Sequence, residues 1–183
     1  LNAEGFAGAL DGLAREEPVA IYPSNDARND GIEELAKADP DEIRERLFAA
    51  TTRLREVMEQ LSPANWAGGV NRLPEGPVWP AASLVEARQR EVEIHHADLG
   101  TAYTHHDWPT EFTQRLLDHT SGSQTFAVRA TDLGRTWPED GGEPVVTGAA
   151  ADLGWWLTGR GSGEGLTSGA GPLPPLDPWQ RSR

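Results

Sequence analysis

The stretch DPDEIRERLFAATTRLREVMEQLS, residues 39–62, carries the clearest helical pattern in the chain. Pro40 and acidic side chains stand in its first turn, where a helix favours proline and negative charge. Apolar side chains recur on one stripe of this stretch, at Ile43, Leu47, Leu54, Met58 and Leu61. The pattern predicts a helix that buries one face in a core, as is typical of an α-helical bundle.

Helical spacing and helix breakers on both sides of this stretch predict the rest of the bundle. We expect the tail of a helix over residues 1–15, a helix over residues 81–99, and a further helix that begins near residue 109. A short helical piece is expected at residues 32–38, and a Pro- and Gly-rich loop at residues 63–80.

Beyond Thr120 the pattern changes. Two short β-prone runs, TFAVRATDLG at 125–134 and EPVVTG at 143–148, are followed by an apolar helical run, AAADLGWWLTGR, at 149–160. The remainder is expected to be loop or tail. We therefore predict a boundary near residue 121. An up-down four-helix bundle with an incomplete first helix would cover residues 1–120, and a small α+β domain would cover residues 121–183.

Composition narrows the classes of partner and chemistry. The formal net charge of -13 repels phosphate backbones, which argues against a nucleic-acid partner. No window approaches the run of about 18 apolar residues that a membrane span needs, and no secretory signal is recognisable, so we predict a cytoplasmic protein without a membrane partner. The chain has no cysteine, and any metal must therefore be held by His, Asp or Glu.

The stretch REVEIHHADLG, residues 90–100, holds two of the five histidines. On a helical wheel Glu93 and His96 fall on the water-facing arc, whereas Glu91 and His95 fall on the inward arc. Apolar residues share that inward arc: Leu84, Val85, Ala87, Val92, Ile94 and Leu99. Buried charge is costly unless it is paired or holds an ion, and side chains at i and i+4 can direct two ligand atoms to one point.

Arg88 and Asp98 also fall on the inward arc, which leaves two interpretations open. Glu91 and His95 either bind a metal, with Asp98 orienting the histidine from behind, or belong to a metal-free hydrogen-bond network with Arg88. The remaining histidines, at His105, His106 and His119, are expected to be structural or solvated, because helix C-termini favour basic groups in any protein.

Four short motifs occur in order along nearly the whole chain: NAEGFAGALDGL at 2–13, YPS…ARN…IEE at 22–34, REVEIHHADLG at 90–100 and GRGSGEGLTS at 159–168. Together they resemble the mycothiol-dependent maleylpyruvate isomerase family, within the DinB-like metal-binding helical bundles. The resemblance implies zinc bound by two histidines and one glutamate, with a position open to water or a thiol. The E-x-x-x-H pair of that family matches Glu91 and His95.

The second ligand histidine of the family would fall three residues before Leu1, outside this sequence. The chain also enters its first helix without a capping residue ahead of Leu1, so we expect further residues upstream. Two protein ligands seldom hold zinc well, since catalytic sites normally use three and a water.

The activity that the resemblance implies is the isomerisation of maleylpyruvate to fumarylpyruvate in the gentisate route of aromatic breakdown. Its partners would be this small-molecule substrate and mycothiol, a low-molecular-weight thiol. Arg160, in the Gly-rich TGRGSGEG, is implied to reach the active site, bind a substrate carboxylate and stabilise an enolate. The pattern alone also fits a cation at a helix C-terminus. Arg88 is a second candidate for anion contact.

Two other functions remain open at this point. The chain could be another mycothiol-dependent transferase or detoxification enzyme with the same metal site. It could instead be a non-catalytic helical binding or regulatory protein, for which zinc analysis is the discriminating test.

Overall fold

The computed structural model describes residues 1–169 and 171–177. The chain divides into two compact units, Leu1–Arg88 and Gln89–Arg183. This division rests on contacts within the chain, whereas the boundary predicted near residue 121 separates domains that would fold independently. That boundary stays a prediction.

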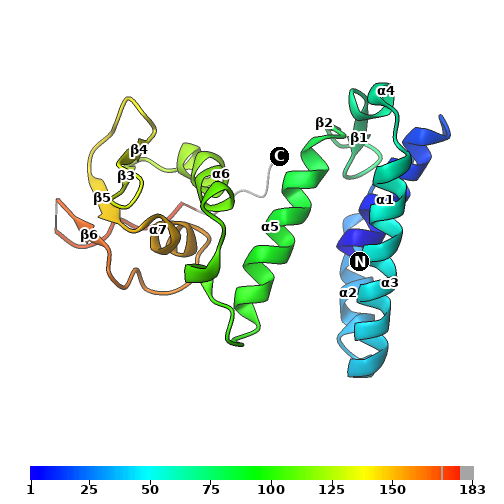
Figure 1. Ribbon diagram of the computed structural model, residues 1–183, viewed down its shortest axis with the longest axis horizontal. Helices are drawn as coiled ribbons and strands as arrows, with labels where there is room; N and C mark the ends of the chain where they lie inside the picture. Colours follow the sequence, from blue (N-terminus) through cyan, green and yellow to red (C-terminus); the bar gives the residue numbers. More distant parts are fainter. Residues whose placement is uncertain (170, 178–183) are drawn as a thin grey trace. The chain divides into compact units, whose positions relative to one another are not determined.

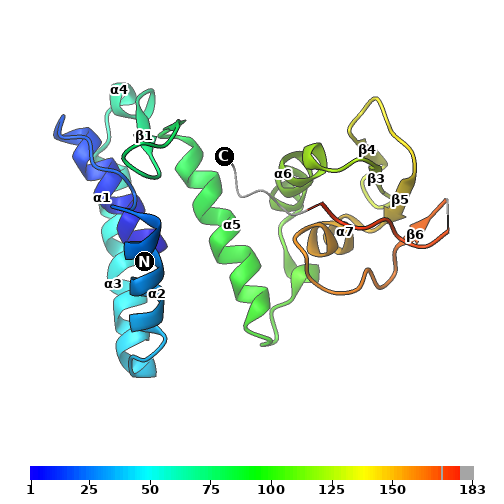
Figure 2. The ribbon, with the colours of Figure 1, turned by 180° about the vertical axis from the view of Figure 1, so that it is seen from behind.

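Three helices form most of the first unit: α1 (Asn2–Ala14), α2 (Asn25–Leu35) and α3 (Pro40–Gln60). α1 packs along α3, with α2 beside them (Figures 1 and 2). The predicted helices at the N-terminus and over residues 39–62 are thus confirmed. α2 begins well before the piece predicted at 32–38, because the Ser24 hydroxyl accepts a hydrogen bond from the Ala27 N–H at 3.0 Å and caps the helix.

The predicted loop at residues 63–80 is wrong in part. It contains a short helix, α4 (Pro63–Trp66), and an antiparallel hairpin of β1 (Gly69–Asn71) and β2 (Val78–Pro80). Each strand has only three residues. Strands this short, bounded by Gly and Pro, have too few positions to show the alternation by which a strand is recognised.

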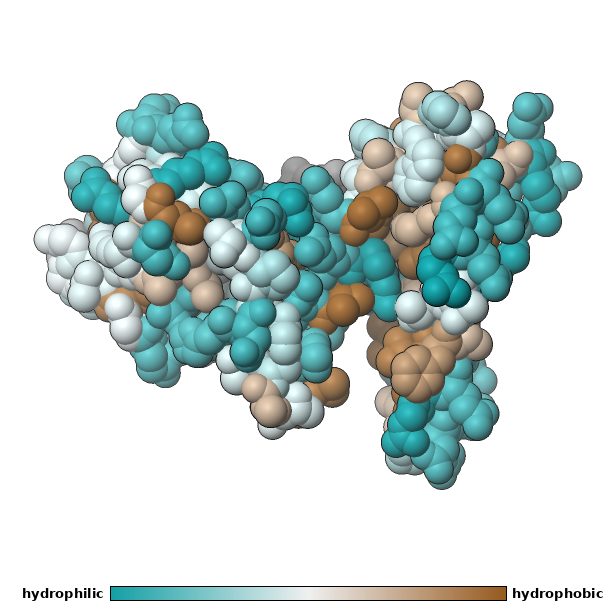
Figure 3. Space-filling view, in the orientation of Figure 1, coloured by the Kyte–Doolittle hydropathy of each residue, from teal (hydrophilic) through white to brown (hydrophobic). Residues whose placement is uncertain are grey.

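The core of the first unit lies between α1, α3 and the start of α5 (Ser83–Asp98). Its largest buried side chains are Phe6, Leu10, Ile21, Leu54, Leu61 and Leu84. The stripe predicted on α3 is therefore buried only in its second half, and Ile43 and Leu47 are exposed. α1 has 13 residues and α3 has 21, so α1 covers only part of α3. Hydrophobic side chains consequently reach the surface of this unit (Figure 3).

The second unit combines helices with a small sheet. Besides the part of α5 from Gln89 onward, it contains α6 (Thr110–Thr120), α7 (Ala150–Leu157) and the short 3-10 turns η1 (His105–Asp107) and η2 (Ser121–Ser123). The sheet has the order β4 (Arg135–Trp137), β3 (Ala127–Ala130), β5 (Val145–Gly148) and β6 (Thr167–Ser168). β3 and β5 are parallel, and the two outer strands pair antiparallel to them.

The predicted fold class, helices followed by a small α+β part, is confirmed. The β-prone runs at 125–134 and 143–148 form β3 and β5, and the helical run at 149–160 forms α7. β4 and β6 were not predicted, since both are very short. Among the described residues, every helix is too short or too polar to cross a bilayer.

α6 and α7 pack against each other, and α7 contacts β3 and β5 (Figure 1). The main core of this unit includes Leu117, Phe126, Val128, Val146, Leu153, Trp156 and Leu157. A smaller cluster joins Ile94 of α5 to Trp108, Phe112 and Leu116. The Trp108 indole N–H also donates to the Glu93 backbone oxygen at 3.0 Å. This packing holds the C-terminal half of α5 in place within the second unit, which also carries Arg160.

The helical wheel assigned some residues of α5 to the wrong face. Three of the residues placed on its inward arc are exposed: Val85, Val92 and Leu99. In the first half of the helix the residues in contact with a core are Leu84 and Ala87, whereas in the second half they are Ile94 and Ala97. The two halves thus pack into different cores, so the buried face rotates along the helix, which a single wheel cannot represent.

Candidate metal and substrate site

The predicted ligand pair lies in the C-terminal half of α5. Glu91 Oε2 and His95 Nε2 are 3.6 Å apart, one helical turn from each other. Two ligands of a tetrahedral zinc, each bonded at about 2.0–2.2 Å, are separated by about 3.3 Å. The pair therefore has nearly the spacing that one metal ion requires.

The other nitrogen of His95 is held by Asp98. His95 Nδ1 lies 2.8 Å from Asp98 Oδ2. Because an ionised carboxylate only accepts hydrogen bonds, this contact requires the proton on Nδ1. In the neutral ring that a metal needs, the lone pair is then on Nε2, the nitrogen that lies near Glu91. A carboxylate behind a histidine in this way is the common arrangement at metal sites.

Arg160, 62 residues further along the chain, binds the same carboxylate. Its Nε and Nη2 donate to the two oxygens of Asp98 at 2.6 and 2.7 Å. This forked hydrogen bond, with a smaller contribution from His95, holds the pKa of Asp98 below its ordinary value against the opposing effect of burial. Asp98 therefore stays ionised and links the predicted ligand pair to the arginine.

The end of α7 positions Arg160. Gly159 precedes it with φ of 77°, a left-handed conformation that glycine adopts without strain and that ends the helix. The Arg160 N–H donates to the Trp155 oxygen at 3.2 Å, and Nη1 donates to the Thr158 oxygen at 3.1 Å. The described side-chain bonds use three of the five guanidinium N–H groups, which leaves donors for an anionic ligand.

Two details of the wheel need correction. His95 was expected to point inward, but its side chain is 56 % exposed, so the pair is open to a metal ion rather than sealed in a core. Glu93 was expected to face water, yet it is half-buried and accepts a hydrogen bond from Tyr103. Burial, together with this carboxylate, raises the pKa of Tyr103 to about 12. His96 is exposed, as predicted, and stacks on Tyr103.

Arg88 is described within the first unit. There its Nη1 donates to Asn2 Oδ1 at 3.3 Å, across from α5 to the start of α1. Its predicted contact with a substrate anion stays a prediction.

Sequence reasoning missed a second grouping of ionisable side chains. His105, expected to be structural or solvated, places Nε2 3.0 Å from Asp152 Oδ1, and His106 lies near the same oxygen. The adjacent histidines were visible in the sequence. Their carboxylate partner was not, because 47 residues separate Asp152 from His105.

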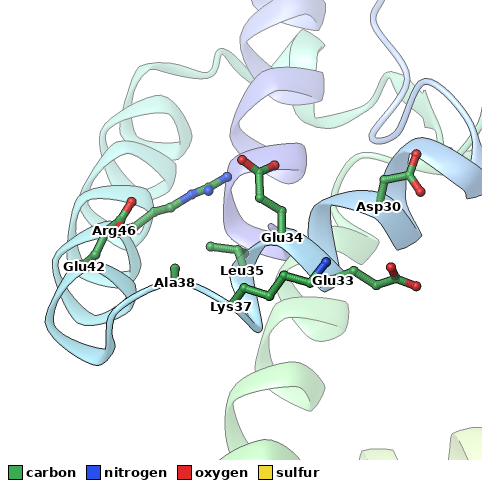
Figure 4. A pocket seen from close by; sticks show the side chains of 8 residues that line it. All are labelled: Asp30, Glu33, Glu34, Leu35, Lys37, Ala38, Glu42 and Arg46. Carbon is green, nitrogen blue, oxygen red and sulfur yellow. The ribbon is translucent and has the colours of Figure 1, made fainter.

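A hollow of about 490 Å³ lies in the first unit, between α2 and α3 (Figure 4). Four carboxylates and two cations line it: Asp30, Glu33, Glu34, Glu42, Lys37 and Arg46. Arg46 also donates two hydrogen bonds to the Glu4 carboxylate, from Nε to Oε1 at 2.6 Å and from Nη2 to Oε2 at 2.9 Å. These bonds lower the pKa of the Glu4 carboxyl. The excess of negative charge makes this hollow a poor site for a carboxylate substrate. The arginine-bearing site in the second unit is the better candidate.

Two protein-family models match the chain. The model of the mycothiol maleylpyruvate isomerase N-terminal domain matches residues 1–100, and the corresponding C-terminal domain matches residues 99–178. The chain belongs to the mycothiol maleylpyruvate isomerase family. The resemblance predicted from the four motifs is thereby confirmed.

Two solved structures are similar to this family member over most of its length. They are the mycothiol-dependent maleylpyruvate isomerase and a histidine-to-alanine mutant of it. Each matches with a TM-score of 0.86 and 27% sequence identity, covering 97% of this chain and 77% of the solved one. None of the curated proteins matches the chain.

Proposed function

We propose that the chain catalyses the mycothiol-dependent, zinc-assisted isomerisation of maleylpyruvate to fumarylpyruvate. One observation carries the proposal: a continuous line of contacts runs from Glu91 through His95 and Asp98 to Arg160. These contacts would place the proposed metal ligands beside a guanidinium that can bind an anion. Family membership and the two similar isomerases support the reaction class.

The chemistry of the donors fits zinc. A carboxylate oxygen and a neutral imidazole nitrogen are ligands that zinc accepts, and the hydrogen bond from His95 to Asp98 is the usual support for such a histidine. Glu91 and His95 would supply two ligands, and the family resemblance implies a histidine as the third. Zinc bound there would lower the pKa of a thiol and keep it as a thiolate.

The reaction needs a nucleophile because a carbon–carbon double bond does not rotate at ambient temperature. The mycothiol sulfur adds to one alkene carbon, and the displaced electron pair moves through the other carbon onto the adjacent carbonyl oxygen as an enolate. The former double bond is then single and rotates. Collapse of the enolate expels the thiolate and restores the double bond in the trans form, so the thiol is regenerated. A chain without cysteine must take this sulfur from a cosubstrate.

Arg160 is the residue that would meet the substrate. Its guanidinium, held against the unit by Asp98 and the Thr158 oxygen, offers its remaining N–H groups to a carboxylate or to the enolate oxygen. Hydrogen-bond donors that are already oriented stabilise developing negative charge without reorganisation. In many enzymes this stabilisation is the largest single contribution to the rate enhancement. Arg88 is the second candidate for anion contact, and it is tested beside Arg160.

The test is an assay of the whole gene product with maleylpyruvate, with and without mycothiol. We expect fumarylpyruvate to form only when the thiol is present, and a zinc chelator to stop its formation. If zinc-loaded protein leaves maleylpyruvate unchanged but joins mycothiol to other electrophiles, the alternative of a transferase or detoxification enzyme is correct. Absence of both activities and of bound zinc would favour a binding protein.

The role of Asp98 as a positioning residue gives a separate prediction. Asp98→Asn should weaken zinc binding at the Glu91 and His95 pair by about 10–100-fold, the usual effect of losing a hydrogen bond behind a ligand histidine. Titration with zinc and a competing indicator measures it. Asp98→Glu should recover part of the affinity, and Glu111→Gln, an exposed carboxylate on α6, should leave it unchanged. An unaltered affinity in Asp98→Asn would show that Asp98 has no part in orienting the histidine.

A further inference from the structure

A second group of metal-ligand atoms lies in the second unit and shares no residue with the proposed isomerase site. His105 Nε2 is 3.0 Å and His106 Nδ1 is 3.7 Å from the same oxygen, Asp152 Oδ1. Each of the three residues offers one ligand atom, and these atoms all lie within 4.8 Å of one another. These separations bracket the distance of about 3.3 Å between two ligands of a tetrahedral zinc.

The backbone holds the two histidines in place before any ion binds. They occupy η1, which begins with a reciprocal cap: the Thr104 hydroxyl accepts from the His106 N–H at 3.3 Å, and Asp107 accepts from the Thr104 N–H at 2.8 Å. These bonds from Thr104 hold the pKa of Asp107 below its ordinary value.

Trp155 and α7 hold the rest of the group. The His105 ring stacks on Trp155 with centroids 5.0 Å apart and planes 7° from parallel. Asp152 stands in the first turn of α7, one turn before Trp155. Two of the three donors are mostly covered, His105 at 19 % and Asp152 at 22 % exposed. Little ordering is therefore needed when an ion binds.

The group opens onto a hollow of about 300 Å³. Residues that line it include Trp156, Arg160 and Glu164 beside the three donors. The hollow gives an ion a route of entry and leaves space for a water or another ligand to complete its coordination. His106, 64 % exposed, stands on the open side.

We propose that His105, His106 and Asp152 form a second divalent-cation site, suited to zinc. Two imidazole nitrogens and one carboxylate oxygen with an open position are a typical zinc ligand set, whereas calcium and magnesium prefer oxygen ligands alone. Binding replaces the hydrogen bond between His105 Nε2 and Asp152 with two bonds to the metal. A neutral His105 then carries its proton on Nδ1, whereas a charged imidazolium must first release one proton to solvent. The proposal is independent of the isomerase activity, since none of its three residues takes part in that function.

The experiment uses the untagged 183-residue chain carrying Glu91→Gln and His95→Gln, which removes the first ligand pair. Titration with zinc against a competing colorimetric indicator should show one bound zinc per chain. Adding Asp152→Asn or His106→Gln should weaken that binding by about 100-fold or more, since loss of a ligand costs at least as much as loss of its support. His96→Gln, an exposed histidine outside the group, is the matched control and should change nothing.

Two results would overturn the proposal. One is that the Glu91→Gln, His95→Gln chain binds no zinc, which would make the group a hydrogen-bond network only. The other is that zinc binds but Asp152→Asn and His106→Gln leave its affinity unchanged, which would put the ion elsewhere. Circular dichroism of each variant separates lost binding from lost structure. His106 is exposed enough for its substitution to spare the fold.

Discussion

Substitution of His95 by alanine is expected to lower the isomerase kcat/KM of the whole gene product by about 1000-fold or more, with the loss of one zinc per chain. A bound metal supplies several kcal/mol of stabilisation, and each 1.36 kcal/mol is about tenfold in rate. His95 Nε2, oriented by Asp98, is one of the ligands that the proposal assigns. Glu91→Ala should have the same effect for the same reason. Steady-state kinetics and metal analysis by mass spectrometry measure both losses.

The neighbouring histidine is the control. His96 is exposed and stacks on Tyr103, so His96→Ala should keep both zinc and turnover. Equal losses in His95→Ala and His96→Ala would mean that the ligand pair is wrongly assigned. Because the second cation site uses other residues, the zinc lost from His95→Ala should be one equivalent and not the whole content.

Replacement of Arg160 by alanine is expected to keep zinc but to lower kcat/KM by about 100–1000-fold, the usual effect of removing one donor that stabilises a developing oxyanion. The proposed donors are guanidinium N–H groups that Asp98 and Thr158 leave unused. Arg160→Lys should restore little activity, since an ammonium cannot reproduce the fork that binds two oxygens. Kinetics at saturating zinc, with metal analysis of the same samples, test both variants.

Arg129 provides a comparison, because it is an exposed arginine on β3 of the same unit, and Arg129→Ala should be fully active. The comparison with Arg88→Ala asks whether a second arginine binds substrate. If Arg160→Ala is isolated without zinc even when metal is supplied in excess, the residue serves the structure of the site through Asp98 and has no direct part in the reaction.

Local patterns predicted those parts of the molecule in which neighbours in sequence are neighbours in space. The stripe at residues 39–62 is α3, and Glu91 and His95 meet because helical rise alone brings i and i+4 together. The short strands β1, β2, β4 and β6 were not predicted, because their structure depends on residues that are distant in sequence. Two or three residues hold too little alternation to be read, and their hydrogen-bond partners decide their structure.

The contact between Glu91 and His95, the helical and α+β fold class and the family motifs could therefore be predicted from residue order, since helix geometry is set within one or two turns. Tertiary packing alone decided the contact between Asp98 and Arg160, 62 residues apart, and the meeting of His105 with Asp152, 47 residues apart. It also decided that Glu93 is half-buried and that His95 is exposed. Such contacts depend on which faces of α5, α6 and α7 pack together. The periodicity of one segment shows which of its own faces is apolar, but not which other segment will pack against that face.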